Sequence, residues 1–278
     1  MKLIIDAGST KTEWIVLDGE KVVNRFITGG YNPNYNDSIV LIDLLYNDLR
    51  EDFPATDAVY YYGSGCGSEV NREEVAQILR VRFEEAKVVM VTHDLMAACH
   101  ALLGHEKGIA CILGTGSNSC LYDGSNIVEQ AVSLGYLIGD EGSGMHIGRE
   151  VVKAYFYGFM PEDLRQKFDQ TYHLTREELL ENLYHKEQPS RFLASFARFA
   201  GENQLCPYIH ELVKDCFVEF VKAFVCRYDN YKSMRINFVG SVAYHFQSIL
   251  EETVSGFGLT MGKVMATPSD GLVRFYKS

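Results

Sequence analysis

Residues 4–18 read IIDAGSTKTEWIVLD, in which two apolar runs flank a turn of small, hydroxylated and charged residues. Short apolar runs on either side of a turn predict a β-hairpin. A simple chain reversal is usually made with Asn-Gly or Pro, and it does not need a carboxylate beside Ile4 and Ile5. The question is therefore whether this turn only reverses the chain or also holds something charged.

The turn DAGSTKT has the groups that a phosphate site needs. Gly8 lets the backbone approach a ligand, Lys11 adds a positive charge, and Asp6 could hold magnesium through water. Hydroxyl donors stand beside backbone amides at Ser9, Thr10 and Thr12. The spacing is not that of a Walker loop, because a strand follows the turn where that motif has a helix. An ordinary hairpin is the alternative.

The same design returns about a hundred residues later. Residues 108–124, GIACILGTGSNSCLYDG, again read as a strand, a glycine-rich turn, a second strand and a closing Asp-Gly. The polar turn consists of Gly114, Thr115, Gly116, Ser117 and Asn118. The repeat predicts two related domains, 1–105 and 106–278, whose turns would clamp a polyphosphate. Chance similarity of two hairpins is the alternative.

Strands and helices alternate along the rest of the chain, which predicts an α/β protein. Apolar runs predict strands at 20–29, 58–63 and 87–92, and a strand, a Gly-Ser turn and a helix over 236–254. Helical spacing of apolar residues predicts helices over 38–52, 71–86, 93–105, 145–160, 175–187, 190–202 and 207–231.

Composition excludes several classes of protein. The chain has 278 residues, 47% of them hydrophobic, and a formal charge of −11, which disfavours non-specific binding to nucleic acid. No apolar run reaches the roughly 18 residues of a membrane helix, and the N-terminal segment does not resemble a signal peptide. The seven cysteines form no C-x-x-C pair, which argues against a zinc site or a disulfide framework. We therefore expect a cytoplasmic protein that binds neither nucleic acid nor membrane.

Asp94 follows the predicted strand 87–92 and begins a helix. A carboxylate at the carboxyl end of a strand is where α/β proteins place a general base. The alternative is a helix N-cap, for which aspartate is among the best residues. His93 is a weaker candidate, since no Ser or Cys is paired with it.

Two further glycine-containing stretches carry candidate ligand groups. GDEGSG at 139–144 holds Asp140 and Glu141 between glycines, where they could accept hydrogen bonds from substrate hydroxyls or act as electrostatic helix caps. FVGSVAYHF at 238–246 sets Gly240 and Ser241 ahead of a helix. Such a junction can seat adenosine or phosphate, although a tight turn needs it equally.

Taken in order, DAGSTKT, VTHDLMAA, LGTGSN, GDEGSG and FVGSVA resemble the motifs of the BadF/BadG/BcrA/BcrD-type ATPases. Within that family the chain is similar to the N-acetylglucosamine kinase-like branch of the actin, sugar kinase and heat-shock chaperone superfamily, over about residues 3–276. The resemblance implies two ribonuclease-H-like α/β domains of the actin-like ATPase fold, with a nucleotide cleft between them.

The resemblance also implies roles for individual residues. Asp94 falls on the catalytic aspartate, and Asp6 should sit near Mg²⁺. The implied nucleotide-binding residues are Gly8, Ser9, Thr10, Lys11, Gly114, Thr115, Gly240 and Ser241. The implied sugar-binding residues are Asn32, Asp94, Ser117, Asn118, Ser133, Leu134, Gly135 and Asp140.

Two departures from the family pattern concern the substrate. Ser133 and Leu134 stand where related kinases have a glycine and a tryptophan that touches the sugar, and QLCP at 204–207 replaces a Gly-Asp-Pro stretch. The resemblance thus predicts an ATP- and Mg²⁺-dependent kinase that phosphorylates N-acetylglucosamine or a related amino sugar at its 6-hydroxyl. Its alternatives are an ATPase that activates a 2-hydroxyacyl-CoA dehydratase, and a nucleotide- or sugar-binding regulator without turnover. A homodimer, and any role of Cys66, are left open.

Overall fold

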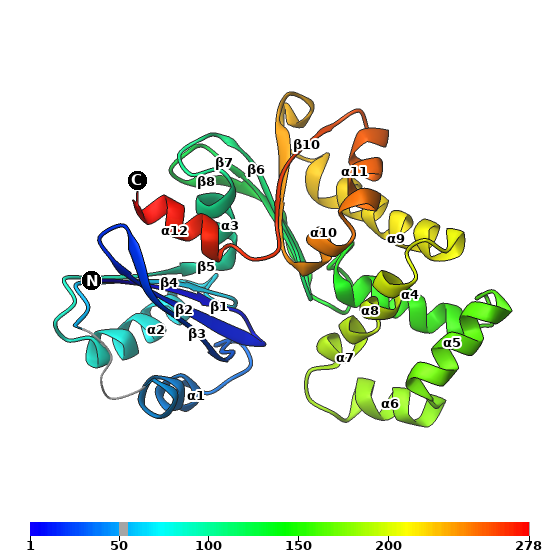
Figure 1. Cartoon of the computed structure of the whole chain (residues 1–278), viewed down its shortest axis with the longest axis horizontal. Helices are drawn as coiled ribbons and strands as arrows, with labels where there is room; N and C mark the ends of the chain where they lie inside the picture. The colour runs from blue at the N-terminus through cyan, green and yellow to red at the C-terminus, as the bar shows by residue number, and fades with distance from the viewer. Residues whose placement is uncertain (50–54, 278) are drawn as a thin grey trace. The chain divides into compact units, whose positions relative to one another are not determined.

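The computed structural model describes residues 1–49 and 55–277, which fall into two compact units (Figure 1). Unit 1 is Met1–Gly104 together with Pro268–Ser278, and unit 2 is His105–Thr267. The expected second domain of 106–278 is therefore wrong at its C-terminal end. The last helix of the chain belongs to unit 1, because it packs against elements of that unit.

Unit 1 is built on a mixed five-stranded sheet with the order β3-β2-β1-β4-β5. Its strands are β1 (Lys2–Ala7), β2 (Lys11–Asp18), β3 (Lys21–Gly29), β4 (Ala58–Gly63) and β5 (Val88–His93). The first three strands form an antiparallel meander, while β1, β4 and β5 run parallel. The predicted hairpin around the opening turn and the predicted strands that follow are confirmed.

The helices of unit 1 cover both faces of this sheet (Figure 1). They are α1 (Ser38–Asp43), α2 (Glu69–Arg82), α3 (Asp94–Leu102) and α12 (Ser269–Lys277). The helix predicted over 38–52 begins as α1 and continues as a π-helical turn, Leu44–Asp48, while 50–52 lie outside the described residues. The buried core under these helices includes Trp14, Tyr31 and Tyr61.

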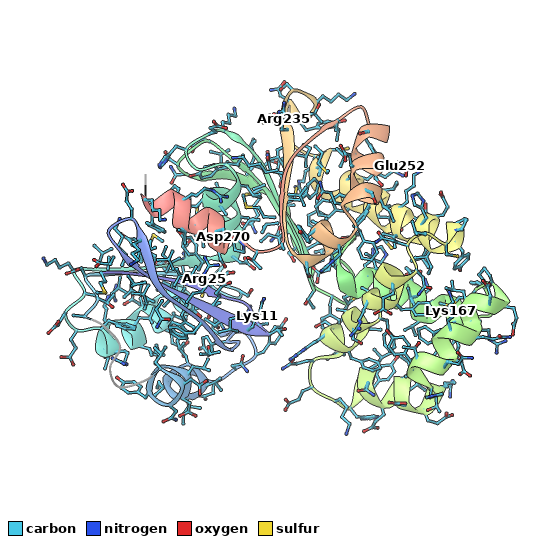
Figure 2. The ribbon with its side chains drawn as sticks, viewed as in Figure 1. Lys11, Arg25, Lys167, Arg235, Glu252 and Asp270 are labelled. Atoms are coloured by element: carbon cyan, nitrogen blue, oxygen red, sulfur yellow. The ribbon has the colours of Figure 1, made fainter. Side chains whose placement is uncertain are left out.

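Helix α12 is fixed to unit 1 by close packing and polar contacts. Gly271 allows this packing, since a Cβ there would lie 2.5 Å from the Ala101 side chain of α3. Asp270 accepts a hydrogen bond of 2.7 Å from Arg25, and Figure 2 shows these two side chains pointing toward each other. Ser269 donates a bond of 2.6 Å to the buried carboxylate of Glu13. These contacts explain why the end of the chain joins the first unit.

Unit 2 repeats the strand arrangement of unit 1, with the order β10-β9-β6-β7-β8. Its strands are β6 (Gly108–Leu113), β7 (Ser117–Tyr122), β8 (Ile127–Gln130), β9 (Arg235–Val239) and β10 (Thr260–Met265). Again a three-stranded meander is extended by two parallel strands. Both units thus have the ribonuclease-H-like topology, and the internal repeat expected from the two turns is present in the fold.

Unit 2 is rich in helices, and some predicted helices are divided. The helices are α4 (Gly144–Phe156), α5 (Glu162–Tyr172), α6 (Arg176–Tyr184), α7 (Pro189–Ser195), α8 (Ala197–Glu202), α9 (Pro207–Phe220), α10 (Ser241–His245) and α11 (Gln247–Gly256). The prediction over 190–202 is wrong as one helix, because the chain turns at buried Phe196. The prediction over 207–231 ends early in a π-helical turn, Val221–Val225.

Helix α5 was not predicted, although Leu164 and Phe168 show helical spacing and are buried. These side chains join a large apolar core with Phe199, Phe217 and Phe238 of the same unit. None of the helices in the described part of the chain is both long enough and apolar enough to cross a membrane.

Candidate functional site

The parallel strands of unit 1 end together at one edge, and this edge carries Asp6, Ser64 and Asp94. Asp6 lies near the end of β1, while Ser64 and Asp94 directly follow β4 and β5. The Ser64 amide donates to the carbonyl of Ala7 at 2.8 Å, which aligns these strand ends. The carboxyl edge of a parallel sheet is where α/β proteins bind ligands.

Asp94 is the first residue of α3, and the N-cap position belongs to His93, which makes no side-chain cap bond. The N-cap alternative for Asp94 is therefore wrong. Its Oδ2 instead accepts a hydrogen bond of 3.2 Å from the Ser64 hydroxyl. Burial raises the pKa of Asp94, while His93 and the Ser64 bond act in the opposite direction. A carboxylate that is positioned by a neighbour and made more basic by burial suits a general base.

Asp6 carries an electrostatic strain that a cation would relieve. Burial and the charges of Glu13 and Asp94 raise the pKa of Asp6 to about 7, and Lys11 opposes them. Glu13 is the antiparallel partner of Asp6 in the β1–β2 register. Among the described residues no three His, Cys, Asp or Glu side chains gather as a metal cage. Mg²⁺ commonly uses one or two carboxylates with waters and phosphates, so the residues present fit that ion.

The first turn presents its polar groups outward. The Gly8 amide donates to the Lys11 carbonyl at 2.9 Å, and the side chains of Ser9, Thr10 and Lys11 are exposed. Thr12 is different, since it is only 1% exposed and its hydroxyl has no hydrogen-bond partner. The expectation that Thr12 offers a hydroxyl to a ligand is therefore wrong, because β2 turns this side chain inward.

Asn32 is tied to the same turn. It is 6% exposed, and its Nδ2 donates to the Ser9 hydroxyl at 2.8 Å. Its Oδ1 accepts from the Asn34 amide at 3.0 Å. Gly65 packs against this amide group, since a Cβ there would lie 2.1 Å from Oδ1. Asn32 therefore links its own loop to the turn DAGSTKT.

Unit 2 brings its own two glycine motifs together at the corresponding strand edge. Gly240 has a φ of +128°, and a Cβ there would lie 2.1 Å from the carbonyl oxygen of Leu113. Only glycine fits this position, because both the backbone angle and the space exclude a side chain. The Gly144 amide donates to the Gly114 carbonyl at 2.8 Å, which brings the start of α4 to the turn.

These junctions open into a cavity of about 560 Å³ within unit 2. Gly114, Thr115 and Ser241 line it, and for these three residues nucleotide binding stays a prediction. Further lining residues come from α7, α8 and α10 and from the residues that follow α8 and α10, and they were not identified from the sequence: Ala194, Ala197, Arg198, Gly201, Glu202, Gln204, Val242, His245 and Phe246. For Arg198 and Glu202 the only signal was the polar face of the predicted helix 190–202, which is also what a solvated helix shows. Val242, His245 and Phe246 lie in the FVGSVAYHF stretch, where only Gly240 and Ser241 were assigned a role.

The GDEGSG loop is held against the second turn. The Ser117 amide donates to Oδ1 of Asp140 at 3.2 Å, and the Ser117 hydroxyl donates to the Glu141 carbonyl at 2.7 Å. Ser117 is buried, so its hydroxyl orients this loop in the structure. Asp140 stays partly exposed with a φ of +57°, and burial raises the pKa of its carboxyl, while the Ser117 amide opposes this shift.

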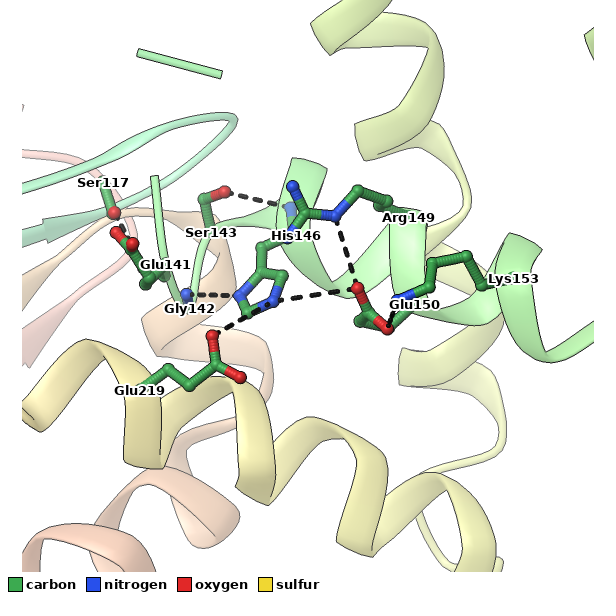
Figure 3. A network of polar contacts seen from close by, with 9 residues as sticks. All are labelled: Ser117, Glu141, Gly142, Ser143, His146, Arg149, Glu150, Lys153 and Glu219. Atoms are coloured by element: carbon green, nitrogen blue, oxygen red, sulfur yellow. Dashed lines mark hydrogen bonds and ion pairs between the residues drawn. The ribbon is translucent and has the colours of Figure 1, made fainter. Parts of the chain in front are cut away.

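Other predicted sugar-site residues lie around this loop. Ser133, Leu134 and Gly135 are exposed, and the Gly135 carbonyl accepts from the Gly139 amide at 2.9 Å. Asn118 is partly buried, and its Oδ1 accepts from the Ser119 amide at 2.8 Å. One residue that the sequence reading missed is His146, which contacts the same loop from α4 (Figure 3).

The repeated topology and the glycine-lined edges define a protein of the actin-like ATPase fold. A model of the BadF/BadG/BcrA/BcrD ATPase family matches residues 5–207, and the chain belongs to that family. The resemblance stated from the motifs is therefore confirmed. A comparison with curated proteins found no match.

The chain is similar to a candidate N-acetylglucosamine kinase from Porphyromonas gingivalis, with 37% identity, a TM-score of 0.95, and coverage of 100% of this chain and 99% of the other. A candidate N-acetylglucosamine kinase from Chromobacterium violaceum shares the fold at 18% identity and a TM-score of 0.74, over 99% of this chain and 98% of that one. A Listeria monocytogenes protein described as a candidate N-acetylmannosamine kinase shares it at 14% identity and a TM-score of 0.51, with coverage of 99% and 98%.

Proposed function

We propose that this protein is an ATP-dependent sugar kinase that phosphorylates N-acetylglucosamine or a closely related amino sugar at the 6-hydroxyl. The observation that carries the proposal is the cavity in unit 2, where Gly114, Thr115 and Ser241 meet. These residues come from two motifs that are far apart in the sequence, and both motifs were predicted to bind nucleotide. Membership of an ATPase family and the 37% identical candidate kinase support it.

The nucleotide would be held mainly by backbone and hydroxyl groups. In unit 2, Gly114 and Gly240 would let the backbone approach it, and Thr115 and Ser241 would donate hydroxyl bonds. In unit 1, the exposed turn formed by Gly8, Ser9, Thr10 and Lys11 would bind phosphate oxygens. Asp6 would hold Mg²⁺ through water, and that ion would supply positive charge to the phosphates.

Asp94 would act as the general base. Its carboxylate would accept the proton of the sugar hydroxyl as that oxygen attacks the γ-phosphate of ATP. Ser64 keeps the carboxylate in place, and burial makes it a better proton acceptor than a free aspartate. Phosphoryl transfer depends mainly on positioning and on charge stabilisation, so one placed carboxylate is sufficient acid–base machinery.

The sugar hydroxyls would be recognised by the partly exposed Asp140 carboxylate and by the loop at Asn32. In the described structure the Asn32 amide already bonds Ser9 and Asn34, so one Nδ2 hydrogen remains for a sugar oxygen. Leu134 is exposed where the related kinases have tryptophan, and it would leave that side of the pocket less restrictive.

The dehydratase-activator alternative needs a reactive cysteine near the site. Cys66 is fully buried, and burial raises the pKa of its thiol to about 12, so it is poorly suited to bind a cluster as a thiolate. A regulator without turnover has no need of a basic carboxylate such as Asp94 at the strand edge. No specific observation therefore favours either alternative.

The decisive experiment is an ADP-release assay with ATP, Mg²⁺ and a panel of glucose, glucosamine, N-acetylglucosamine and N-acetylmannosamine. We expect turnover with N-acetylglucosamine or its nearest analogue, and a 6-phosphate product in the phosphorus NMR spectrum. Asp94→Asn is the matched control, since it keeps size and hydrogen bonding. Nucleotide binding without turnover on any sugar would refute the kinase assignment.

A further inference from the structure

The loop that carries Asp140 is followed by a buried histidine for which the proposed chemistry has no use. His146 lies in the first turn of α4 and is 2% exposed. A buried histidine is commonly a core residue that one hydrogen bond satisfies. Here polar groups face both ring nitrogens, as Figure 3 shows.

The first turn of α4 has a modified capping box. Ser143 is the N-cap, and its hydroxyl accepts the His146 amide at 3.1 Å. In a standard capping box the third helical residue returns a bond to the N-cap amide. In this protein Nδ1 of His146 reaches one residue further back and accepts the Gly142 amide at 3.0 Å. The imidazole therefore bonds to the loop that precedes the helix.

The hydrogen bond at Nδ1 decides the tautomer of the ring, and the surroundings of Nε2 can be compared with that assignment. Because Nδ1 accepts a bond, the ring proton is assigned to Nε2. Nε2 lies 3.7 Å from Glu219 of α9 and 4.0 Å from Glu150 of α4. Arg149 and Lys153 in turn contact Glu150 at 3.3 and 2.7 Å. Burial and Arg149 lower the pKa of His146 to about 4, against the pull of Glu150, so the ring is neutral near pH 7.

The loop needs such an anchor because its backbone is strained. Asp140 has a φ of +57° and Gly142 a φ of +72°, and a non-glycine residue in the left-handed region persists only where contacts hold it. Ser117 holds one end of the loop through Asp140 and Glu141. His146 holds the other end through Gly142.

We propose that His146 is a positioning residue that keeps the Asp140 carboxylate in its ligand-binding orientation by accepting the Gly142 amide. The inference deepens the proposed function, since it takes a sugar to be the ligand of Asp140. Protonation would turn Nδ1 into a donor that faces the donor of Gly142, and the loop would then lose this anchor. Loss of the acceptor should therefore weaken sugar binding while ATP binding is kept.

His146→Leu and His146→Asn form a matched pair, because the two side chains have similar size and only asparagine has an acceptor near the position of Nδ1. The first measurement is exchange of the Gly142 amide with solvent by NMR, together with the tautomer of His146. We expect a protected amide in the wild type and in His146→Asn, and exchange about tenfold faster in His146→Leu, as loss of one buried hydrogen bond implies.

The second measurement is steady-state kinetics. We expect the sugar KM to rise about tenfold in His146→Leu and to stay within about threefold in His146→Asn, with the ATP KM unchanged in both. Thr175→Ala is the control for simple destabilisation, since it removes the N-cap bond to Glu178 (3.1 Å) on another helix, α6. It should lower Tm and leave the sugar KM unchanged.

The outcomes separate the two claims. If His146→Leu lowers Tm as Thr175→Ala does, but leaves Gly142 exchange and the sugar KM unchanged, His146 is only a packing residue and the inference is overturned. If the wild type turns over no sugar, the proposed function fails, and Gly142 exchange alone then decides whether His146 holds the loop. Unprotected Gly142 in the wild type would overturn the inference by itself.

Discussion

Replacing Asp6 by asparagine should stabilise the ligand-free protein at alkaline pH while it impairs Mg²⁺-dependent turnover. The pKa of Asp6 rises from 3.8 to about 7 through burial and the charges of Glu13 and Asp94. Keeping such a group ionised at pH 8 costs about 4 kcal/mol relative to the unfolded chain. Asp6 as a residue is partly accessible to water, which screens part of this cost, so we expect a gain of about 2 kcal/mol.

The pH dependence follows from the direction of the shift. Well below pH 3.8 the carboxyl is protonated in both the folded and the unfolded states, so Asp6→Asn should change stability little. As pH rises toward 7, only the unfolded state of the wild type ionises readily, and the wild type loses stability. The advantage of the variant should therefore grow between about pH 4 and 7 and then stay constant.

Urea unfolding followed by tryptophan fluorescence reports on the stability of unit 1, to which Asp6 belongs. Trp14 is the single tryptophan of the chain and is fully buried on β2, next to Glu13. Asp57→Asn is the control with the opposite sign, because the N-terminal amino group lowers the pKa of Asp57. That variant should lose a little stability at pH 8 while Asp6→Asn gains.

An Asp6→Asn variant that is no more stable than the wild type at pH 8 would refute the electrostatic account of Asp6. The functional half is tested with the same protein. We expect the Mg²⁺ concentration needed for half-maximal turnover to rise more than the sugar KM, because Asp6 is proposed to act through the ion. An unchanged Mg²⁺ requirement in the folded variant would make Asp6 a structural residue only.

Asp94→Asn should lower kcat by at least about a hundredfold with sugar binding largely kept, and wild-type turnover in this variant would remove Asp94 as the base. Asp140→Asn should weaken binding of the sugar by about 1–3 kcal/mol in calorimetry, since a sugar hydroxyl loses its charged acceptor; unchanged affinity would place Asp140 outside the pocket. Leu134→Trp should sharpen discrimination between N-acetylglucosamine and glucosamine, and an unaltered KM ratio would contradict this. Gly148→Ala should lower the unfolding free energy by about 3 kcal/mol, because its Cβ would lie 1.9 Å from the Leu193 carbonyl oxygen, and a wild-type Tm would disprove that packing.

The sequence by itself determined the two hairpins and their equivalence. Residues 4–18 and 108–124 have local signals that need no partner: apolar strands, a small polar turn and a closing Asp-Gly. Gly19 and Gly124 both have positive φ values, of 57° and 104°, which is the conformation that this closing turn requires. The position of Asp94 could also be predicted from local signals, because the pattern of a strand ends there and the pattern of a helix begins.

Contacts between distant segments were decided only by the tertiary structure. The sequence could not show that the Thr12 side chain of β2 is buried, that the Ser117 hydroxyl donates to a carbonyl of the GDEGSG loop, or that His146 accepts a hydrogen bond from the Gly142 amide. It also could not assign α12 to unit 1, since an amphipathic helix does not specify which surface will bury its apolar face. Local propensity reflects interactions within a few residues, whereas these outcomes depend on which surfaces and hydrogen-bond partners packing brings together.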